Sequence, residues 1–511
     1  MVMIDALIII STNFYAFARS LFYLYRLQSY DYHATFKLKP IAFNCLVSLA
    51  LATAVVTEKY LSVVGVLIFF TLLLLIGVLL LTAYYSYRKR FKFTARGIRV
   101  SLPYFLCIFA LNVTFSLVFN GFIRLLCLTL TAVISEYILF IMNSIIAPFE
   151  RKRNYAYAMR NSRAVRESDL IKIVITGSFG KTSCKNILLK LLEEKYSVFT
   201  PSGNMNTPMG ISRYIAKLPA GFSESEKPVI FLAEAGARRR GDVKDICRLI
   251  GVNYGIITGV CDQHLDTFRT TENIKKAKQE LADFIGENGV VVFNGDNEHT
   301  LKMSKEYPGK SIVVGEKNGN VKIENLRSTI LGTSFNLVTE SGVMALKTSL
   351  LGRHNAFNVA LAVALAMELG IEKESVKKVV ESLEPVPHRL ELIKANNLSI
   401  LDDGYNANER GVMLGLELVS TYPGRKVVYA QGVVECGLKK KKINLKIGQK
   451  VGEIADVIIL SGENAKYIRR GILSSGYKGK IYHFKNILHA KREFGNILKG
   501  GDLLYLQNDI P

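Results

Sequence analysis

The sequence LSVVGVLIFFTLLLLIGVLLLTAYY (61–85) has no charged residue and is longer than the roughly 20 apolar residues that cross a bilayer. It predicts a transmembrane helix. Shorter apolar stretches predict four more spans, at about 4–25, 40–57, 102–119 and 122–146. The first of these contains Arg19, so an interfacial helix or a signal-like segment is the alternative there.

The loops beside these stretches predict an orientation. YRKRFKFTARGIR (87–99) and ERKRNYAYAMRNSR (150–163) are strongly basic, and basic loops stay in the cytoplasm. Five spans then place the N-terminus outside and everything after residue 150 inside. We expect a multi-pass protein of the cytoplasmic membrane whose catalytic domains lie in the cytoplasm.

The same loops account for much of the net charge of +23, so nucleic acid is not an expected partner. The seven cysteines lack paired metal spacing, and neither a zinc site nor a disulfide is predicted from them.

From residue 170 the pattern changes to short β-branched runs that alternate with helical stretches such as 181–194. This alternation predicts a mostly parallel α/β sheet. A second series of strands follows residue 385, and Pro385 and Pro387 mark a hinge, since each disfavours helix at the preceding residue. The predicted fold is therefore an α-helical transmembrane domain (1–150), a P-loop α/β domain (151–384) and a smaller Rossmann-like α/β domain (385–511).

The segment ITGSFGKTSCKN (175–186) has the composition of a phosphate-binding loop between a strand and a helix. Backbone N–H groups and a helix N-terminus converge on phosphate oxygens in such loops. Lys181 is expected at the β- and γ-phosphates of ATP and Thr182 at a magnesium ion. Ile175 stands where the common form of this loop has a glycine, so the loop is a shorter form. The predicted nucleotide contacts here are Thr176, Gly177, Ser178, Gly180, Lys181 and Thr182.

This short form resembles the phosphate loop of the Mur ligase family, which forms amide bonds with ATP in peptidoglycan synthesis. The resemblance covers about residues 165–511 and continues in the family's order. Its further segments are GNMNTPMG (203–210), EAGARRRGD (234–242), QHLDTFRTTENIKKAKQEL (263–281), LGRHNAFNVALAVALA (351–366) and DDGYNANERGVMLGLELV (402–419). Within the family, GRHNAFN and DDGYNAN most resemble the members that add D-alanyl-D-alanine to a UDP-muramoyl tripeptide.

The resemblance implies a set of metal-binding and catalytic residues. Glu234 and His264 would hold a second magnesium ion, while Thr182 holds the first. Lys278 would be carbamylated and would help to bind metal, although Lys275 and Lys276 are nearby alternatives. Lys181, His264 and Lys278 are thus the expected catalytic residues.

The resemblance also implies further contacts with the nucleotide and the substrate. Asn355 would lie at the adenine, and Arg389 and Asp403 would reach the nucleotide when the C-terminal domain closes. A substrate loop would contain Asn204, Asn206 and Thr207.

The implied function is an ATP-dependent carbon–nitrogen ligase that forms an acyl phosphate in cell-wall or surface-glycan synthesis. Predicted spans occupy the position of the family's UDP-gripping domain, which favours a membrane-linked carboxylate acceptor. The alternative is a membrane-anchored ligase of UDP-muramoyl tripeptide and D-alanyl-D-alanine; a P-loop kinase or transport ATPase is a more remote one. QGVVECG (431–437) and QNDI (507–510) depart from the D-alanyl-D-alanine-adding members, which leaves the amine or amino-acid donor open.

Overall fold

The computed structural model describes Phe14 and residues 95–119, 121–202, 205–261, 268–385, 387–388, 390–395, 397–404, 409–433 and 440–507. The chain divides into two compact units, Met1–Ala156 and Tyr157–Pro511. Apart from Phe14, the three predicted spans before residue 95 lie outside the described residues and stay predictions.

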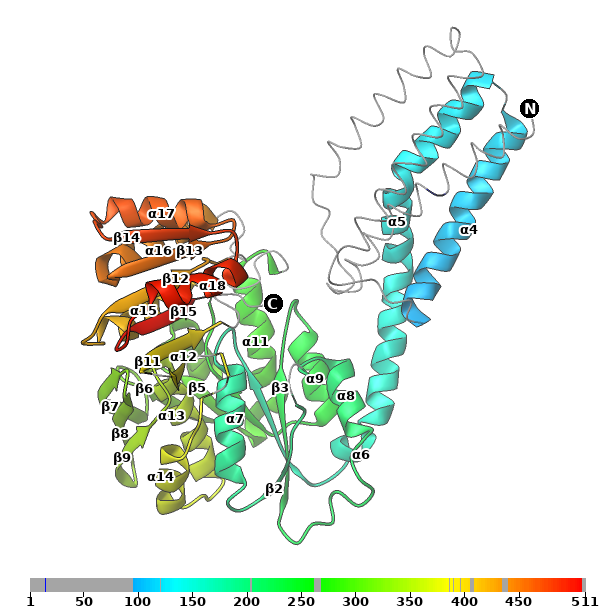
Figure 1. The fold of residues 1–511 in the computed structure, drawn as a ribbon. Coiled ribbons are helices and arrows are strands. Elements are labelled where there is room, and N and C mark those ends of the chain that lie inside the picture. Colours follow the sequence, from blue (N-terminus) through cyan, green and yellow to red (C-terminus); the bar gives the residue numbers. More distant parts are fainter. Residues whose placement is uncertain are drawn as a thin grey trace. The chain divides into compact units, whose positions relative to one another are not determined.

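The described part of the first unit is helical (Figure 1). Helix α4 is Ala95–Val118, and helix α5, Gly121–Asn161, continues past the unit boundary. The predicted spans 102–119 and 122–146 fall almost wholly within these two helices. By length and composition, Gly97–Val118 is long and apolar enough to cross a membrane. The two helices contact each other through a small apolar cluster around Tyr104 and Leu139.

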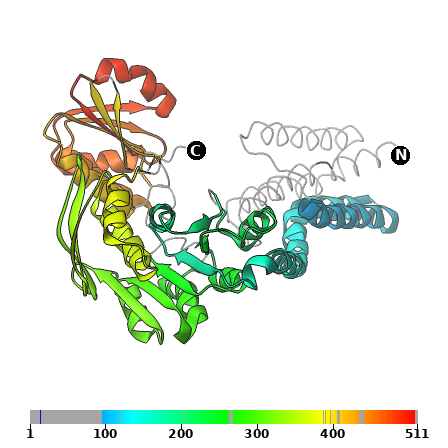
Figure 2. The ribbon, with the colours of Figure 1, turned by 90° about the horizontal axis from the view of Figure 1, so that it is seen from below.

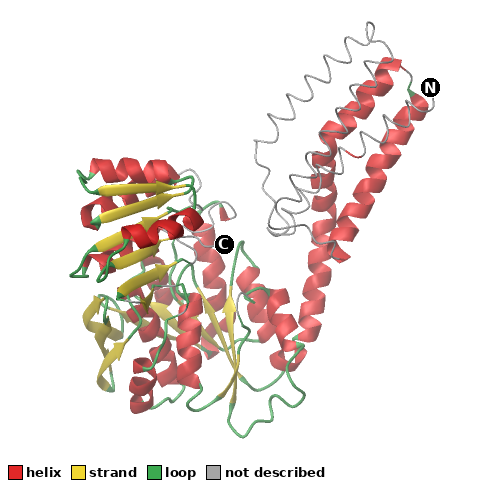
Figure 3. Ribbon diagram, in the orientation of Figure 1, coloured by secondary structure: helices red, strands yellow, loops and turns green. Residues whose placement is uncertain are grey.

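A nine-stranded sheet forms the first part of the second unit, in the order β2-β3-β1-β4-β5-β6-β7-β8-β9 (Figure 3). Neighbours are parallel from β2 to β7, and β7, β8 and β9 are antiparallel. The predicted parallel sheet is confirmed, but the sequence did not predict the antiparallel extension. The strands are β1 Ile171–Thr176, β2 Ser197–Phe199, β3 Val229–Ala235, β4 Tyr254–Ile257, β5 Val290–Asn294, β6 Lys310–Gly315, β7 Val321–Thr329, β8 Gly332–Thr339 and β9 Gly342–Thr348.

Helices cover both faces of this sheet because its central strands are apolar on both sides. Successive side chains of β1 point to opposite faces, so Ile173 and Ile175 join one buried cluster and Val174 joins the other. The first face packs against α7 (Lys181–Leu192), α13 (Arg353–Glu368) and α14 (Lys373–Glu381), of which the last two lie beside the green strands in Figure 2. The second face packs against α8 (Pro208–Ile215), α9 (Asp242–Ile250), α11 (Thr271–Ile285) and α12 (Glu298–Glu306).

Helix α7 was predicted at 181–194 and ends two residues earlier. Its predicted apolar face is confirmed, since Ile187, Leu188, Leu191 and Leu192 are all buried. Helix α13 differs from α7 because it is buried on nearly every side, which fits its almost unbroken run of alanine, valine and leucine. Such a helix belongs to a core rather than to a surface.

The rest of the unit is a six-stranded sheet in the order β10-β11-β15-β12-β13-β14. The second α/β series is therefore confirmed, with one addition: β10 is an antiparallel edge strand that the sequence did not predict. Separate apolar clusters cover the two faces of the sheet. The elements are β10 Glu391–Ala395, β11 Leu398–Asp403, α15 Glu409–Ser420, β12 Lys426–Ala430, α16 Lys440–Ile454, β13 Val457–Ser461, α17 Ala465–Ser474, β14 Lys480–Phe484, α18 Ile487–Ile497 and β15 Leu503–Gln507.

Candidate functional site

The candidate site lies where β3, β1 and β4 end beside one another in the nine-stranded sheet. Ile175 of β1 is in register with Glu234 of β3, and Thr176 is in register with Ile257 of β4. The carboxyl ends of parallel strands therefore meet at one edge, which is where open α/β sheets bind ligands. Polar side chains gather there against a strongly apolar sheet.

The phosphate loop connects β1 to α7 as the sequence predicted. Gly177 and Gly180 adopt φ values of 149° and 73°, which L side chains rarely adopt. A Cβ atom at Gly180 would also lie 2.4 Å from Asn358 Oδ1, and one at Gly177 would lie 2.1 Å from Thr258 Oγ1. Both glycines are therefore required by the close packing of the loop. Helix α7 begins directly after Gly180, so its first N–H groups are available to an anion.

The end of β4 fixes the shape of this loop. The backbone N–H of Ser178 donates to Gly259 O at 2.8 Å, and the hydroxyl of Thr258 donates to Phe179 O. Ser178 Oγ in turn accepts a bond from Cys261 N at 3.2 Å. The Thr176 hydroxyl donates to Ala235 O at 3.0 Å. The side chains of Thr176 and Ser178, together with the Ser178 N–H, thus hold the loop in place, and the predicted contacts of these two residues with phosphate stay predictions.

The first residues of α7 connect the loop to β3. Lys181 Nζ donates to Gly177 O at 2.9 Å, across the loop itself. Thr182 Oγ1 donates to Glu234 Oε2 at 2.8 Å, and Asn206 Nδ2 donates to the other carboxylate oxygen at 3.3 Å. Glu234 is 6% exposed, so this carboxylate is buried among polar partners. A hydroxyl beside a carboxylate is the hard oxygen set that magnesium prefers.

Lys278 is buried on α11, at 3% exposure. Burial, with repulsion from Lys181, lowers the pKa of Lys278 to about 7, against the attraction of Asp242, Glu280 and Glu234. The alternatives differ from it: Lys275 is half-buried, and the side chain of Lys276 is 49% exposed and lies 3.9 Å from a carboxylate. Among these three lysines, only Lys278 is buried.

Helix α11 is held against α9 by a carboxylate. Glu280 accepts bonds from the backbone N–H groups of Gly241 at 2.6 Å and Lys244 at 3.0 Å. These groups lie at the N-terminus of α9, whose unpaired N–H groups and partial positive charge favour an anion. Glu280 was not predicted from the sequence, although it lies two residues after Lys278. It therefore fixes the helix that carries the buried lysine.

Lys185 is a second residue that sequence reasoning missed. It lies one turn after Lys181 on α7, is 4% exposed, and donates to Pro201 O at 2.9 Å. Burial lowers the pKa of Lys185, while Glu234 opposes this shift. It connects α7 to the start of the segment that leads to Asn206. Its spacing of four residues from Lys181 was the signal, because positions i and i+4 share one face of a helix.

Asn355 lies on α13 and is 7% exposed. Its Nδ2 donates to Leu351 O at 2.8 Å, and its Oδ1 accepts a bond from Asn358 Nδ2 at 3.2 Å. Because Asn358 packs against Gly180, Asn355 supports the phosphate loop through its neighbour. Its predicted contact with adenine stays a prediction.

The remaining predicted residues bond to groups outside the phosphate loop or lie outside the described residues. Thr207 caps α8, where its hydroxyl accepts a bond from Gly210 N at 3.2 Å. Asp403 ends β11 in the six-stranded sheet and accepts a bond from the Tyr505 hydroxyl at 3.0 Å. Asn204, His264 and Arg389 lie outside the described residues, so their predicted roles are unchanged.

Comparisons with known proteins point in the same direction as this geometry. Residues 175–366 match the Mur ligase middle domain. A UDP-N-acetylmuramoyl-tripeptide–D-alanyl-D-alanine ligase of Escherichia coli is 27% identical over 281 residues, which are 54% of this chain and 61% of that relative. The ligase of the same name from Bacillus subtilis is 26% identical over 65% of this chain and 72% of its own length.

Solved structures share the fold. The structure of a Thermotoga maritima MurF ligase in complex with ADP matches with a TM-score of 0.61 at 23% identity. The match covers 70% of this chain and 80% of that one. The two α/β sheets are therefore arranged in the fold of that ligase.

Proposed function

Since the chain belongs to the Mur ligase family, we propose that it is an ATP-dependent carbon–nitrogen ligase that joins a carboxylate to an amine. The observation that carries this proposal is the polar cluster at the end of β3. Thr182 from the phosphate loop helix and Asn206 both bond to the buried carboxylate of Glu234. A phosphate loop is also compatible with a kinase, but the buried lysine at position 278 and the match to the Mur ligase middle domain favour the ligase.

The chemistry assigns a task to each of these groups. A carboxylate is a poor electrophile, so the γ-phosphoryl group of ATP is transferred to it before the amine attacks and phosphate leaves. Lys181 and the N–H groups at the start of α7 stabilise negative charge on the phosphoryl oxygens, which preorganised donors do well in a site that excludes water. Thr182 and Glu234 are the described residues that would hold magnesium, which neutralises phosphate charge when bound.

The depressed pKa of Lys278 supports carbamylation of that lysine. Only a neutral amine adds to carbon dioxide, with loss of a proton and formation of a carbamate anion. An ordinary lysine, with a pKa near 10.4, is almost entirely protonated at pH 7. Lys278, with its pKa lowered to about 7, is neutral far more often at that pH than an ordinary lysine. The resulting negative group would lie on the helix that Glu280 fixes.

For the substrates, we propose a UDP-linked muramoyl tripeptide as the acceptor and D-alanyl-D-alanine as the amine. The names of the Escherichia coli and Bacillus subtilis relatives support this pair. The test incubates the purified full-length protein with ATP and each substrate alone, then with both. A ligase forms the amide product, detected by its mass, together with ADP and phosphate only when both are present. Phosphate left on either substrate would instead show a kinase.

The distribution of side chains on α4 and α5 favours a second candidate, a carboxylate acceptor that is itself linked to the membrane. The exposed side chains of these helices include many large apolar ones, such as Leu106, Phe109, Ile141 and Phe149. Several of their buried side chains are polar, namely Ser101, Asn112, Thr131, Ser135, Asn143 and Glu150. Apolar groups outside and polar groups inside are typical of helices in lipid. We therefore propose a location in the cytoplasmic membrane, with the second unit in the cytoplasm.

A truncated chain that begins at Tyr155 distinguishes a membrane anchor from a part that presents the acceptor. It keeps the phosphate loop, Glu234 and Lys278, so ATP should bind to it as to the full chain. If the first unit presents the acceptor, the truncated chain should ligate a detergent-dispersed lipid-linked acceptor more slowly, because positioning supplies a high effective concentration. Equal rates for both chains on that acceptor would show that the first unit is only an anchor.

A further inference from the structure

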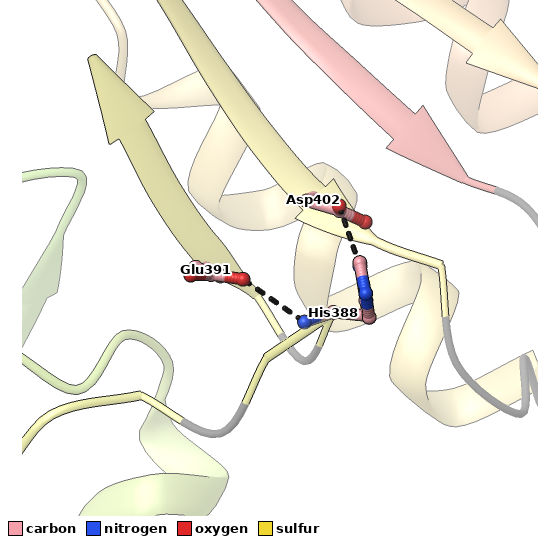
Figure 4. A group of neighbouring side chains, drawn as sticks. All are labelled: His388, Glu391 and Asp402. Atoms are coloured by element: carbon pink, nitrogen blue, oxygen red, sulfur yellow. Dashed lines mark hydrogen bonds and ion pairs between the residues drawn. The ribbon is translucent and has the colours of Figure 1, made fainter.

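We propose that His388, Glu391 and Asp402 form a binding site for a divalent transition-metal ion, with zinc as the probe. These residues lie at the start of the six-stranded sheet and belong neither to the phosphate loop nor to the cluster around Glu234 (Figure 4). Their candidate ligand atoms, one imidazole nitrogen and one oxygen from each carboxylate, all lie within 4.8 Å of one another. No ion is present in the structure.

The β10–β11 hairpin forces the two carboxylates together. Glu391 and Asp402 are directly opposite each other in this antiparallel pair, so their side chains emerge on the same face. Like charges at directly opposed positions destabilise a sheet. Within the described part of the chain, neither carboxylate forms an ion pair with a lysine or arginine. A cation at this point would remove the repulsion.

His388 supplies the third ligand from the segment just before β10. Its Nδ1 lies 2.8 Å from Asp402 Oδ2, and its backbone N–H donates to Glu391 Oε2 at 3.0 Å. Its φ of 63° is uncommon for a residue other than glycine, so the surrounding contacts hold this conformation. Asp402 is also fixed, because its Oδ1 accepts a bond from Gly404 N at 3.0 Å. The ring contacts Asp402 and the backbone N–H contacts Glu391, so these bonds hold the three residues close together.

The donor set selects the class of ion. An imidazole nitrogen with two carboxylate oxygens suits zinc and its neighbours, whereas magnesium is bound mainly through oxygen and keeps several waters. Zinc bonds to nitrogen and oxygen are about 2.0–2.2 Å long, so the three ligand atoms would draw closer together around one ion. Asp402 is 6% exposed and His388 lies at the surface, so the site is buried at its aspartate and open to solvent at its histidine. Three protein ligands leave a fourth position for water or a substrate oxygen.

Metal binding would tie the segment before β10 to the end of β11. His388 immediately precedes Arg389 and Asp402 immediately precedes Asp403, the two residues predicted to reach the nucleotide. The ion would therefore fix the backbone on either side of those residues. This consequence for the nucleotide rests on the proposed function, but binding of the ion does not.

The test measures zinc on the full-length protein in detergent, stripped with EDTA and then dialysed against zinc in excess magnesium, without ATP or either substrate. His388→Gln removes one ligand at an exposed position. His489→Gln is the matched control, because this exposed histidine of the same domain contacts Asn486 rather than a carboxylate. We expect the unmodified protein and the His489→Gln control to hold one more zinc per chain than His388→Gln. Zinc should also raise their melting temperature, since a ligand that binds only the folded state stabilises it.

Glu391→Gln provides a second variant at the edge strand. We expect it to weaken zinc binding about tenfold or more, since even groups that only orient metal ligands change affinity by roughly 10- to 100-fold. Equal zinc content and equal thermal shifts in the unmodified protein and His388→Gln would overturn the proposal, leaving a histidine–aspartate hydrogen bond. Because no nucleotide is present, failure of this test leaves the ligase proposal unaffected. Failure of ligation likewise leaves the zinc result unaffected.

Discussion

Helices α5 and α7 distribute their apolar residues in opposite ways. On α7 the buried face carries Ile187, Leu188, Leu191 and Leu192, and charged residues such as Lys190 face outward. On α5 the large apolar side chains Ile134, Ile141, Ile145 and Phe149 are exposed, while Thr131, Ser135, Asn143 and Glu150 are buried. The buried Glu150 is paired with Arg99 at 2.5 Å. The exposed side chains of α7 suit water, whereas the proposed membrane location would place those of α5 against lipid.

The comparison separates the region of the proposed chemistry from the region of the proposed membrane anchor. The polar groups of the phosphate loop lie at the edge of an apolar sheet, where each has a partner with a defined distance. The polar groups of α5 lie along a helix face, and nothing among the described residues places a nucleotide-binding loop there. Substitutions in one region should therefore leave the property of the other unchanged.

The largest expected effect comes from Lys181→Ala. Removing a positioned cation from the transferring phosphoryl group should lower turnover at least roughly 10²- to 10³-fold, as loss of one oxyanion donor does. Ligation rates measured on membranes that contain equal amounts of protein give the comparison. Lys190→Ala on the exposed side of the same helix is the control and should keep full activity. Both variants should remain attached to the membrane. Near-normal turnover in Lys181→Ala would contradict the assignment.

Lys278→Ala should also be inactive, and a small carboxylic acid should restore part of the activity. The reason is that the proposed carbamate supplies a negative charge, which an added carboxylate can replace in the space left by the side chain. Turnover with and without the acid is compared with that of Lys276→Ala, whose side chain is 49% exposed in the unmodified protein. If Lys278→Ala keeps its activity without the acid, carbamylation of this lysine is not needed.

An arginine on the exposed face of α5 tests the other side of the comparison. If Ile141 faces lipid, Ile141→Arg should cost roughly 3 kcal/mol of membrane insertion, the order found for a charge near the centre of a spanning helix. The fraction of protein retained in carbonate-washed membranes measures this, with Ile141→Leu as the control. Equal retention of the two variants would mean that this face meets water or protein instead.

The smallest expected effect is the pH dependence of stability from Lys278. Its folded pKa of about 7 lies below the ordinary lysine value, so the unfolded state binds more protons between these two values. Stability should therefore rise with pH above 7. Relative to Lys278→Met, the unmodified protein should gain roughly 2 to 3 kcal/mol of unfolding free energy from pH 6 to pH 9, at about 1.4 kcal/mol per pKa unit. Denaturant unfolding without added bicarbonate measures the difference, and a flat difference would mean that Lys278 keeps its ordinary pKa.

The sequence alone determined the local elements and the phosphate loop. A sheet that is covered on both faces buries successive side chains, so the short apolar runs of β1, β3, β4, β5, β6 and β11–β15 were predictable from short windows. The phosphate loop was predictable from its glycines, because only glycine readily adopts the backbone conformation at positions 177 and 180. The strands β2, β10 and β7–β9 were not predicted, since they are short or largely exposed and therefore lack a continuous apolar run.

The tertiary structure decided which side chains share an environment. From the sequence, Lys275, Lys276 and Lys278 were three nearby lysines, and only packing of α11 buried the last one. Lys185 and Glu280 gained their roles from Pro201, Gly241 and Lys244, which no short window contains. The opposition of Glu391 and Asp402 likewise exists only in the β10–β11 register. A pKa, an ion pair and a metal site depend on distances through space, and those distances arise only when segments far apart in the chain pack together.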